Sequence, residues 1–287
     1  MLLKTVTNHF LQYMSSIDRS NATISGYQKD LTAFQRYLET KLNCEVYIDE
    51  LVSKDIDDYL YYLKETRGHA PASRARYLHT VRSFFNYAYK KEYVARNIAL
   101  SVETISVQQK ERIALSDEEV EHLVNAIDHE IIKVVVKVLY LTGMRISECL
   151  HVTMDDIDME KRVIHVVAGK GNKDRLLPVS NRLVPILQHY IQFQRPEASS
   201  NLLFCTKKTG KLSPVYVNKC ISDAVKKLKW KKKVTAHILR HSFASQLVKK
   251  DVNLVQIQKL LGHSSLKVTS IYTHTDMNQL SEAVNHL

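Results

Sequence analysis

The C-terminal part of the chain carries the feature that most constrains its fold and chemistry, a set of four side chains: His237, Arg240, His263 and Tyr272. Arg240 follows His237 by three residues, and on a helix this spacing places both side chains on one face, where they can bind the same anionic group. The apolar spacing of residues 254–261 predicts a short amphipathic helix that ends at Gly262 and returns the chain to the first helix. The segment therefore predicts a phosphate-binding site with a tyrosine beside it.

Two further elements precede this segment. Arg145 lies in the run TGMRISE, and Lys170 lies in AGKGNKDR. Together with the His-x-x-Arg helix, the Leu-Gly-His run and a tyrosine nine residues beyond that histidine, they resemble the signature of the tyrosine site-specific recombinases of the lambda-integrase and Xer type. An isolated tyrosine or His-x-x-Arg pair is common, so the order of all five elements carries the resemblance.

The resemblance implies DNA strand cleavage by a covalent mechanism. Tyr272 is expected to attack a phosphodiester, forming a 3′-phosphotyrosyl link and freeing a 5′-hydroxyl, so that rejoining needs no ATP. Arg145 and Arg240 are expected to stabilise the charge that builds on the non-bridging oxygens. Because two guanidinium groups supply this stabilisation, we expect no metal ion and no other cofactor.

The remaining elements are expected to move protons or to orient other groups. By resemblance, Lys170 protonates the departing 5′ oxygen, His237 accepts or orients the tyrosine proton, and His263 donates a hydrogen bond to the phosphate. Glu148 follows Arg145 by three residues and matches the acidic position of the family. We expect it to support the site by orienting neighbouring side chains.

Simpler interpretations stay open at this point. Tyr272 is one of 15 tyrosines, and an isolated tyrosine more often packs than reacts. Arg145 could serve only as the salt-bridge partner of Glu148. The same elements could also belong to a DNA-relaxing enzyme of the topoisomerase IB type, or to a catalytically silent DNA-binding accessory protein. The last alternative requires a lost catalytic residue, and none of the expected residues is missing.

The composition is consistent with a nucleic-acid partner. The chain has 41 Lys plus Arg against 30 Asp plus Glu, a net charge of +11, and most of the excess falls after residue 105. Its four cysteines form no Cys-x-x-Cys pair, which argues against a disulfide framework or a zinc ribbon. We expect a cytoplasmic protein, because the sequence shows neither a secretory signal nor an apolar run of membrane length.

Two domains are predicted, at residues 1–103 and 114–287, joined by a linker at 104–113. The length of 287 residues favours two domains over one. Ser116 and Glu119 have the spacing of a capping box, which marks the start of a new helix directly after the polar linker.

The N-terminal domain is predicted to consist of four helices, from their apolar spacing: residues 3–16, 20–42, 53–66 and 71–91. Its position and helical pattern are similar to the SAM-like core-binding domain with which these recombinases clamp DNA. Basic residues and a serine around the start of the fourth helix are suited to phosphate contacts. The candidate DNA-binding residues here are Arg67, Ser73, Arg74, Arg76 and Arg82.

The C-terminal domain is predicted to mix helices with a small β-sheet. Residues 117–127 and 130–142 have helical spacing, and residues 162–180 alternate β-branched side chains around a glycine-rich turn, which predicts a hairpin. Lys170 lies at this turn, and we expect Lys173 and Arg175 to bind backbone phosphates. The overall fold class is therefore mostly α, with a mixed α+β catalytic domain of the tyrosine-recombinase type.

The resemblance also implies an assembly. Double-stranded DNA with inverted-repeat core sites is the expected partner, and four protomers would assemble on two such sites and exchange strands through a Holliday junction. The amphipathic segment at about 276–287 is too short to fold alone and is expected to dock on a neighbouring protomer, although it could dock on its own domain instead. The pattern leaves open an accessory protein or a second recombinase, and whether the task is dimer resolution, transposon cointegrate resolution, integration or excision.

Overall fold

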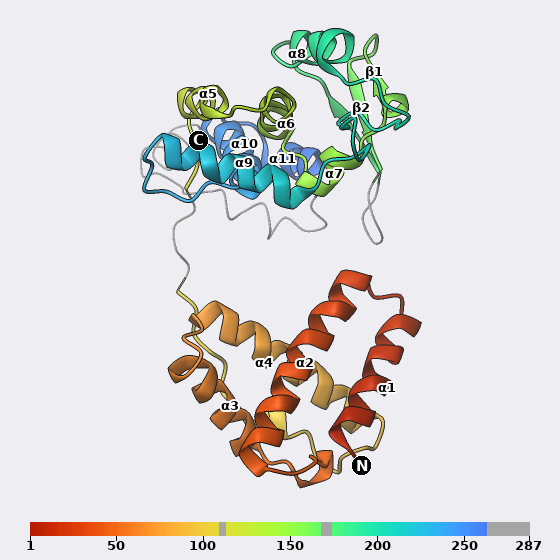
Figure 1. Ribbon diagram of the computed structural model, residues 1–287, viewed down its shortest axis with the longest axis vertical. Helices are drawn as coiled ribbons and strands as arrows, with labels where there is room; N and C mark the ends of the chain where they lie inside the picture. Colours follow the sequence, from red (N-terminus) through yellow and green to blue (C-terminus); the bar gives the residue numbers. More distant parts are fainter. Residues whose placement is uncertain (109–112, 168–173, 263–287) are drawn as a thin grey trace, which may run out of the picture. The chain divides into compact units, whose positions relative to one another are not determined.

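The computed structural model of the protein describes residues 1–108, 113–167 and 174–262. The chain divides into two compact units, Met1–Lys110 and Glu111–Leu287, and the division falls within the segment predicted as a linker (Figure 1). Within the described ranges, no helix combines the length and the apolar content that a membrane crossing requires.

The N-terminal unit is helical, as predicted. Its elements are α1 (Leu3–Ser16), α2 (Asn21–Leu42), the short turn η1 (Ile48–Glu50), α3 (Ser53–Glu65), α4 (Pro71–Lys90) and the short turn η2 (Ile98–Leu100). The ends of the four α-helices agree with the predicted ranges to within one residue. Aromatic side chains contribute to the core: Phe10 packs edge-on against Phe84, and Phe34 packs against Tyr59 in a tilted arrangement.

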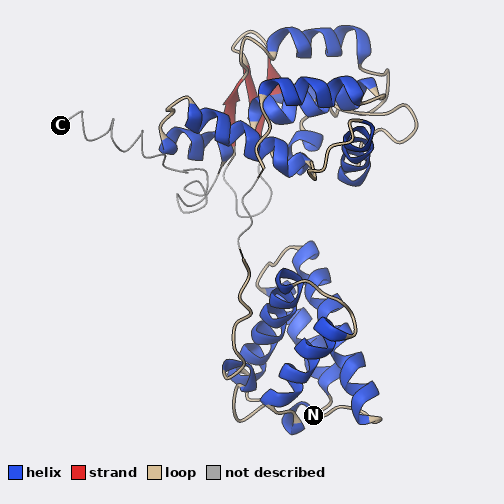
Figure 2. Ribbon diagram, turned by 90° about the vertical axis from the view of Figure 1, so that its left-hand side faces the viewer, coloured by secondary structure: helices blue, strands red, loops and turns tan. Residues whose placement is uncertain are grey.

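The C-terminal unit combines helices with a three-stranded antiparallel sheet in the order β1-β2-β3 (Figure 2). Its helices are α5 (Asp117–Ala126), α6 (Glu130–Thr142), α7 (Ile146–His151), α8 (Val184–His189), α9 (Pro214–Lys227), α10 (Ala236–Lys249) and α11 (Leu254–Leu261). The short turn η3 (Met154–Asp156) follows α7, and the π-helix η4 (Tyr190–Gln194) continues α8. Its strands are β1 (Ile157–Asp158), β2 (Val163–Val166) and β3 (Arg175–Pro178). The predicted fold class, mostly helical with a small sheet, is confirmed.

Local signals explain where these elements begin and end. Ser116 and Glu119 form the predicted capping box at the start of α5, with reciprocal hydrogen bonds of 3.2 and 3.1 Å. Strands β2 and β3 pair in the predicted hairpin, with Val166 opposite Arg175. Gly262 ends α11 in the left-handed conformation, at φ +66°, as predicted.

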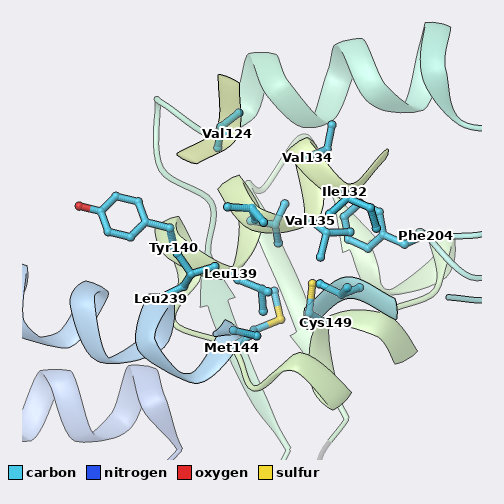
Figure 3. Close-up of a cluster of buried hydrophobic side chains, with 14 of the residues drawn as sticks. Val124, Ile132, Val134, Val135, Leu139, Tyr140, Met144, Cys149, Phe204 and Leu239 are labelled. Carbon is cyan, nitrogen blue, oxygen red and sulfur yellow. The ribbon is translucent and has the colours of Figure 1, made fainter. Parts of the chain in front are cut away.

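Helix α6 is the centre of the C-terminal core. It is apolar on nearly every side, packs against α5, α7 and α10, and buries Ile132, Val135 and Leu139 (Figure 3). Valine is only a moderate helix former, so burial rather than intrinsic propensity stabilises this helix. Because α6 leads directly into the turn that carries Arg145, the core fixes the base of the predicted site.

Candidate active site

The turn between α6 and α7 requires the glycine of the TGMR run. Gly143 has φ +66°, and a Cβ added to it would lie 2.3 Å from Cδ1 of Phe243 and 2.9 Å from Cδ2 of Leu261. A side chain here would therefore be strained by its backbone conformation and would also displace the side chains of Phe243 and Leu261. The glycine lets three segments that are distant in sequence come together at the site.

Arg240 lies at this junction and is 3% exposed. Its Nη1 donates to the carbonyl of Gly143 at 2.7 Å, and its Nη2 donates to the carbonyl of Leu261 at 2.8 Å. Both carbonyls lie at helix C-termini, where unpaired carbonyl groups and the helix dipole favour a cation. The guanidinium thus joins the ends of α6 and α11. His237 lies one turn earlier on α10 and is exposed.

Arg145 precedes α7 and is more accessible, with 37% of its side chain exposed. Its Nη1 donates to Oε1 of Glu148 at 2.6 Å, and its backbone N–H donates to Oε2 of the same residue at 2.8 Å. Glu148 therefore caps the N-terminus of α7 and holds the arginine side chain as well. The predicted pair of Arg145 and Glu148 is present, in a geometry that leaves part of the guanidinium at the surface.

Three arginines surround Glu148, which is 7% exposed. Besides Arg145, Arg175 binds the carboxylate through two hydrogen bonds, Nη1 to Oε1 at 3.1 Å and Nη2 to Oε2 at 2.8 Å. Nη1 of Arg240 lies 3.9 Å from Oε2. Three positive charges against one negative charge leave a net charge of two, so the cluster can attract a further anion.

These contacts hold the carboxylate in its charged form. Burial raises the pKa of the Glu148 carboxyl, but the hydrogen bonds and charge of Arg175 and the hydrogen bonds from Arg145 outweigh burial and lower the pKa to about 2. At neutral pH Glu148 is ionised and can orient both arginines.

Arg175 is placed differently from the prediction that it binds backbone phosphates. Its side chain is 9% exposed, and its Nε donates to the carbonyl of Leu260 at 2.9 Å while the two Nη atoms bind Glu148. The difference arises because all three guanidinium nitrogens of Arg175 donate to acceptors within the unit. Sequence reasoning missed this role, although one signal existed: Arg175 shares a strand face with Leu177, which is buried.

Four residues of the prediction lie outside the described residues: Lys170, Lys173, His263 and Tyr272. The structure nevertheless describes the residues that flank them. Strands β2 and β3 lead into and out of the segment that contains the two lysines. Helix α11 and Gly262 lead directly to His263. Among the described residues, no group of three or more His, Cys, Asp or Glu is arranged to hold a metal ion.

The candidate DNA-binding residues of the N-terminal unit fall into two groups. Arg76 pairs with Asp30, and Arg82 donates to the carbonyl of Val102 and, at 3.1 Å, to the hydroxyl of Thr104, so both also support the fold. Arg67 and Ser73 are exposed and half-buried, respectively.

Arg74, the fifth candidate, has a different environment. It lies in the first turns of α4, is half-buried, and its Nε is buried without a hydrogen-bond partner in the part of the chain that the structure describes. Because this nitrogen is buried, the Nη atoms of Arg74 rather than its Nε would have to make any contact with DNA.

The fold and the site together define a class: a two-unit protein with a helical unit and an α+β unit whose cationic site is suited to a phosphate. Comparison with known proteins makes the class specific. Residues 114–279 match the phage integrase family, and residues 7–92 match the phage integrase N-terminal SAM-like domain.

Individual relatives agree with these matches. The chain is 31% identical over 291 residues to a tyrosine recombinase of Thermosipho africanus (strain TCF52B), over 98% of this chain and 99% of that one. It is similar to the crystal structure of the XerH site-specific recombinase bound to a palindromic difH substrate in a post-cleavage complex, with 27% identity, a TM-score of 0.72, and coverage of 92% of this chain and 79% of that one. The Tn1549 transposon integrase in complex with a circular intermediate DNA shares the fold, with a TM-score of 0.84 at 19% identity and full coverage of both chains.

The chain belongs to the phage integrase family. It is a site-specific tyrosine recombinase, an enzyme that breaks and rejoins DNA strands. The predicted family and activity are thereby confirmed, and the topoisomerase alternative is not favoured.

Proposed function

We propose that the protein cleaves DNA through a 3′-phosphotyrosyl intermediate. The hydroxyl oxygen of Tyr272 attacks the phosphorus, the bond to the 5′ oxygen breaks, and the phenolic proton passes to His237 while Lys170 protonates the leaving oxygen. His263 donates to a non-bridging oxygen. The reverse reaction, with a 5′-hydroxyl from another strand, rejoins the DNA without an external energy source.

The arrangement of Arg145 and Arg240 around Glu148 carries this proposal. Both arginines are held by hydrogen bonds of 2.6–2.8 Å within the unit, so little reorganisation is needed when charge develops on the phosphate. The negative charge of the ionised Glu148 offsets the electrostatic repulsion between the two guanidinium groups. Catalysis of phosphoryl transfer depends mainly on charged groups that are already in position around the phosphate.

Capture of the covalent intermediate tests the proposal. DNA that remains attached to the protein after denaturing purification is recovered and sequenced for the wild type, Tyr272→Phe and the control Tyr216→Phe, which changes an exposed tyrosine of the same unit. We expect attached DNA with one shared end sequence in the wild type and the control, and none in Tyr272→Phe.

Other outcomes would count against the proposal. Attached DNA without a shared end would indicate a relaxing enzyme of the topoisomerase type. Absence of an adduct, also on a nicked substrate from which the cleaved strand diffuses away, would contradict strand cleavage and favour the accessory-protein interpretation.

The N-terminal unit is proposed to clamp the DNA. The proposed domain bounds are residues 1–103 and 114–287. The exposed Arg67, and Arg74 in the first turns of α4, support phosphate contacts from this unit. Ser73, Arg76 and Arg82 lie on α4 together with Arg74 and are also proposed to contribute. In the catalytic unit we retain Lys173 as a phosphate-binding candidate.

We further propose that four protomers act on two DNA sites with inverted-repeat cores, through a Holliday junction. The palindromic substrate of the related XerH complex supports inverted repeats. The segment at about 276–287 would join neighbouring protomers, and an accessory protein or a second recombinase is compatible with this scheme. Since its substrate is DNA, the cytoplasm is the proposed location.

A further inference from the structure

Arg175 is the most fully bonded cation near the site. Each of the three nitrogens of its guanidinium donates inside the unit: Nε to the carbonyl of Leu260 at 2.9 Å, Nη1 to Oε1 of Glu148 at 3.1 Å, and Nη2 to Oε2 of Glu148 at 2.8 Å. Such a paired geometry fixes the plane of the carboxylate as well as its position. A lysine has three N–H donors on a single atom, so it could not reproduce this planar, paired geometry.

Three described elements that lie next to proposed catalytic residues in the sequence meet at this side chain. Arg175 is the first residue of β3 and lies close after the segment that contains Lys170. Glu148 lies on α7 and binds Arg145. Leu260 lies at the end of α11, just before Gly262 and His263.

The contact with the end of α11 is close. A Cβ added to Gly262 would lie 2.8 Å from Nη1 of Arg175 and 3.1 Å from its Cζ, so the guanidinium rests directly on this glycine. Gly262 has a left-handed conformation, which sets the direction in which the chain leaves α11. Arg175 packs directly against this residue.

We propose that Arg175 is a positioning residue, which fixes the Glu148 carboxylate and thereby aims Arg145 at the scissile phosphate. It also ties the base of the Lys170 hairpin to the helix end that precedes His263. The inference rests on the proposed function, since it assigns a role in the same cleavage reaction.

The bonding pattern explains how this positioning works. Glu148 accepts from the side chain of Arg145, from its backbone N–H and from both Nη atoms of Arg175. Without Arg175, two of these hydrogen bonds to the buried carboxylate are lost and it can rotate. Arg145 would follow, because its side chain is held to the same oxygen, and a displacement of about 1 Å at a reacting group can slow a reaction about 10²-fold.

A single-turnover cleavage assay tests the inference. The nicked substrate is cleaved by saturating amounts of the wild type, Arg175→Gln and the control Arg182→Gln, which removes an exposed arginine paired with Asp117 at 3.1 Å in the same unit. We expect cleavage by Arg175→Gln to be about 10²-fold slower, with unchanged affinity for DNA, and cleavage by Arg182→Gln to be unchanged. An unchanged rate for Arg175→Gln would overturn the inference, as would a loss that lies entirely in DNA affinity.

A double variant separates positioning through Glu148 from general support of the fold. If Arg175 acts through the carboxylate, Arg175→Gln combined with Glu148→Gln cleaves about as slowly as the slower single variant, because the second change removes nothing further. If the two losses multiply, Arg175 acts independently of Glu148 and the inference is wrong.

Two further measurements keep the outcome clear. Should Arg175→Gln be poorly folded, Arg175→Lys retains the charge but not the paired geometry, and it is expected to bind DNA normally and still to cleave more slowly than the wild type. Wild-type cleavage by Arg175→Lys would overturn the inference. Adduct formation by the wild type and not by Tyr272→Phe, in the same assay, shows that the proposed function holds regardless of the result for Arg175.

Discussion

In the N-terminal unit the arginines Arg76 and Arg82 each have partners of their own, whereas in the C-terminal unit three arginines converge on the single carboxylate of Glu148. Arg76 pairs with the buried Asp30 but keeps 54% of its side chain exposed. The first arrangement spreads positive charge over a surface. The second concentrates it at a point, where the loss of one partner affects every other member.

The largest expected difference between the units comes from neutralising the acid in each. Glu148→Gln leaves three arginines around an uncharged group, and we expect a loss of about 3–5 kcal/mol in the unfolding free energy of the C-terminal unit. Asp30→Asn should cost the N-terminal unit only about 1–2 kcal/mol, because the exposed Arg76 can turn to water and the hydroxyl of Thr80 retains an acceptor.

Hydrogen exchange of backbone amides in the full chain measures both losses, since each unit reports its own unfolding. Fluorescence of Trp230, the single tryptophan, gives an independent value for the C-terminal unit. Equal losses in the two units would contradict the comparison.

Glycine substitutions give a second, smaller contrast. Gly143→Ala adds a Cβ 2.3 Å from Phe243 at a residue with φ +66°, so strain and overpacking together should destabilise the C-terminal unit by about 2–4 kcal/mol. Gly68→Ala in the N-terminal unit has a similar φ of +61° but no atom within 4 Å of the added Cβ, and should cost about 1 kcal/mol. Thermal unfolding of both variants checks this, and a similar cost for both would show that packing at Gly143 contributes little.

The stability of the C-terminal unit should also depend on pH through Glu148. The pKa of Glu148 is lowered from 4.5 to about 2 in the folded state, so its contribution is fully present above pH 4.5 and is lost as the pH falls toward 2. The loss should be about 2–3 kcal/mol. The stability difference between the wild type and Glu148→Gln, measured by Trp230 fluorescence in urea, should therefore shrink across this range, and a constant difference would contradict the assignment.

The smallest effect is expected for DNA binding by the N-terminal unit, where the positive charge is spread over a surface. Arg74→Gln should weaken DNA binding modestly and reduce the slope of log affinity against log salt concentration by about one, with little change in the cleavage rate of bound substrate. Arg182→Gln serves as the matched control and should leave the slope unchanged. Binding titrations at several salt concentrations measure this, and an unchanged slope for Arg74→Gln would remove Arg74 from the DNA interface.

Much of the fold could be predicted because its signals are local. Apolar spacing gave the four N-terminal helices to within one residue, and the capping box at Ser116 and Glu119 gave the start of α5. The salt bridge between Arg145 and Glu148 was also predicted, as the simpler interpretation of Arg145, because a spacing of three residues brings two side chains close together.

The role of Arg175 could not be predicted in the same way. Its partners lie 27 and 85 residues away in the sequence, at Glu148 and Leu260. Strand β3 has only four residues, RLLP, and the two adjacent leucines obscure which face is buried. The hydrogen bonds of Arg240 could not be predicted either. Every residue has a backbone carbonyl, and only the three-dimensional fold determines which carbonyls lie next to Arg240.

The position of Arg240 between two helix ends has a practical consequence for protein engineering. Substituting it would release the carbonyls of Gly143 and Leu261 together and loosen the scaffold along with the chemistry. Under the proposed function, an inactive protein intended for capturing an intact DNA assembly is better made at Tyr272 or at the partly exposed Arg145. Deep mutational libraries should show the same asymmetry, with Arg240 variants depleted even when only soluble expression is selected.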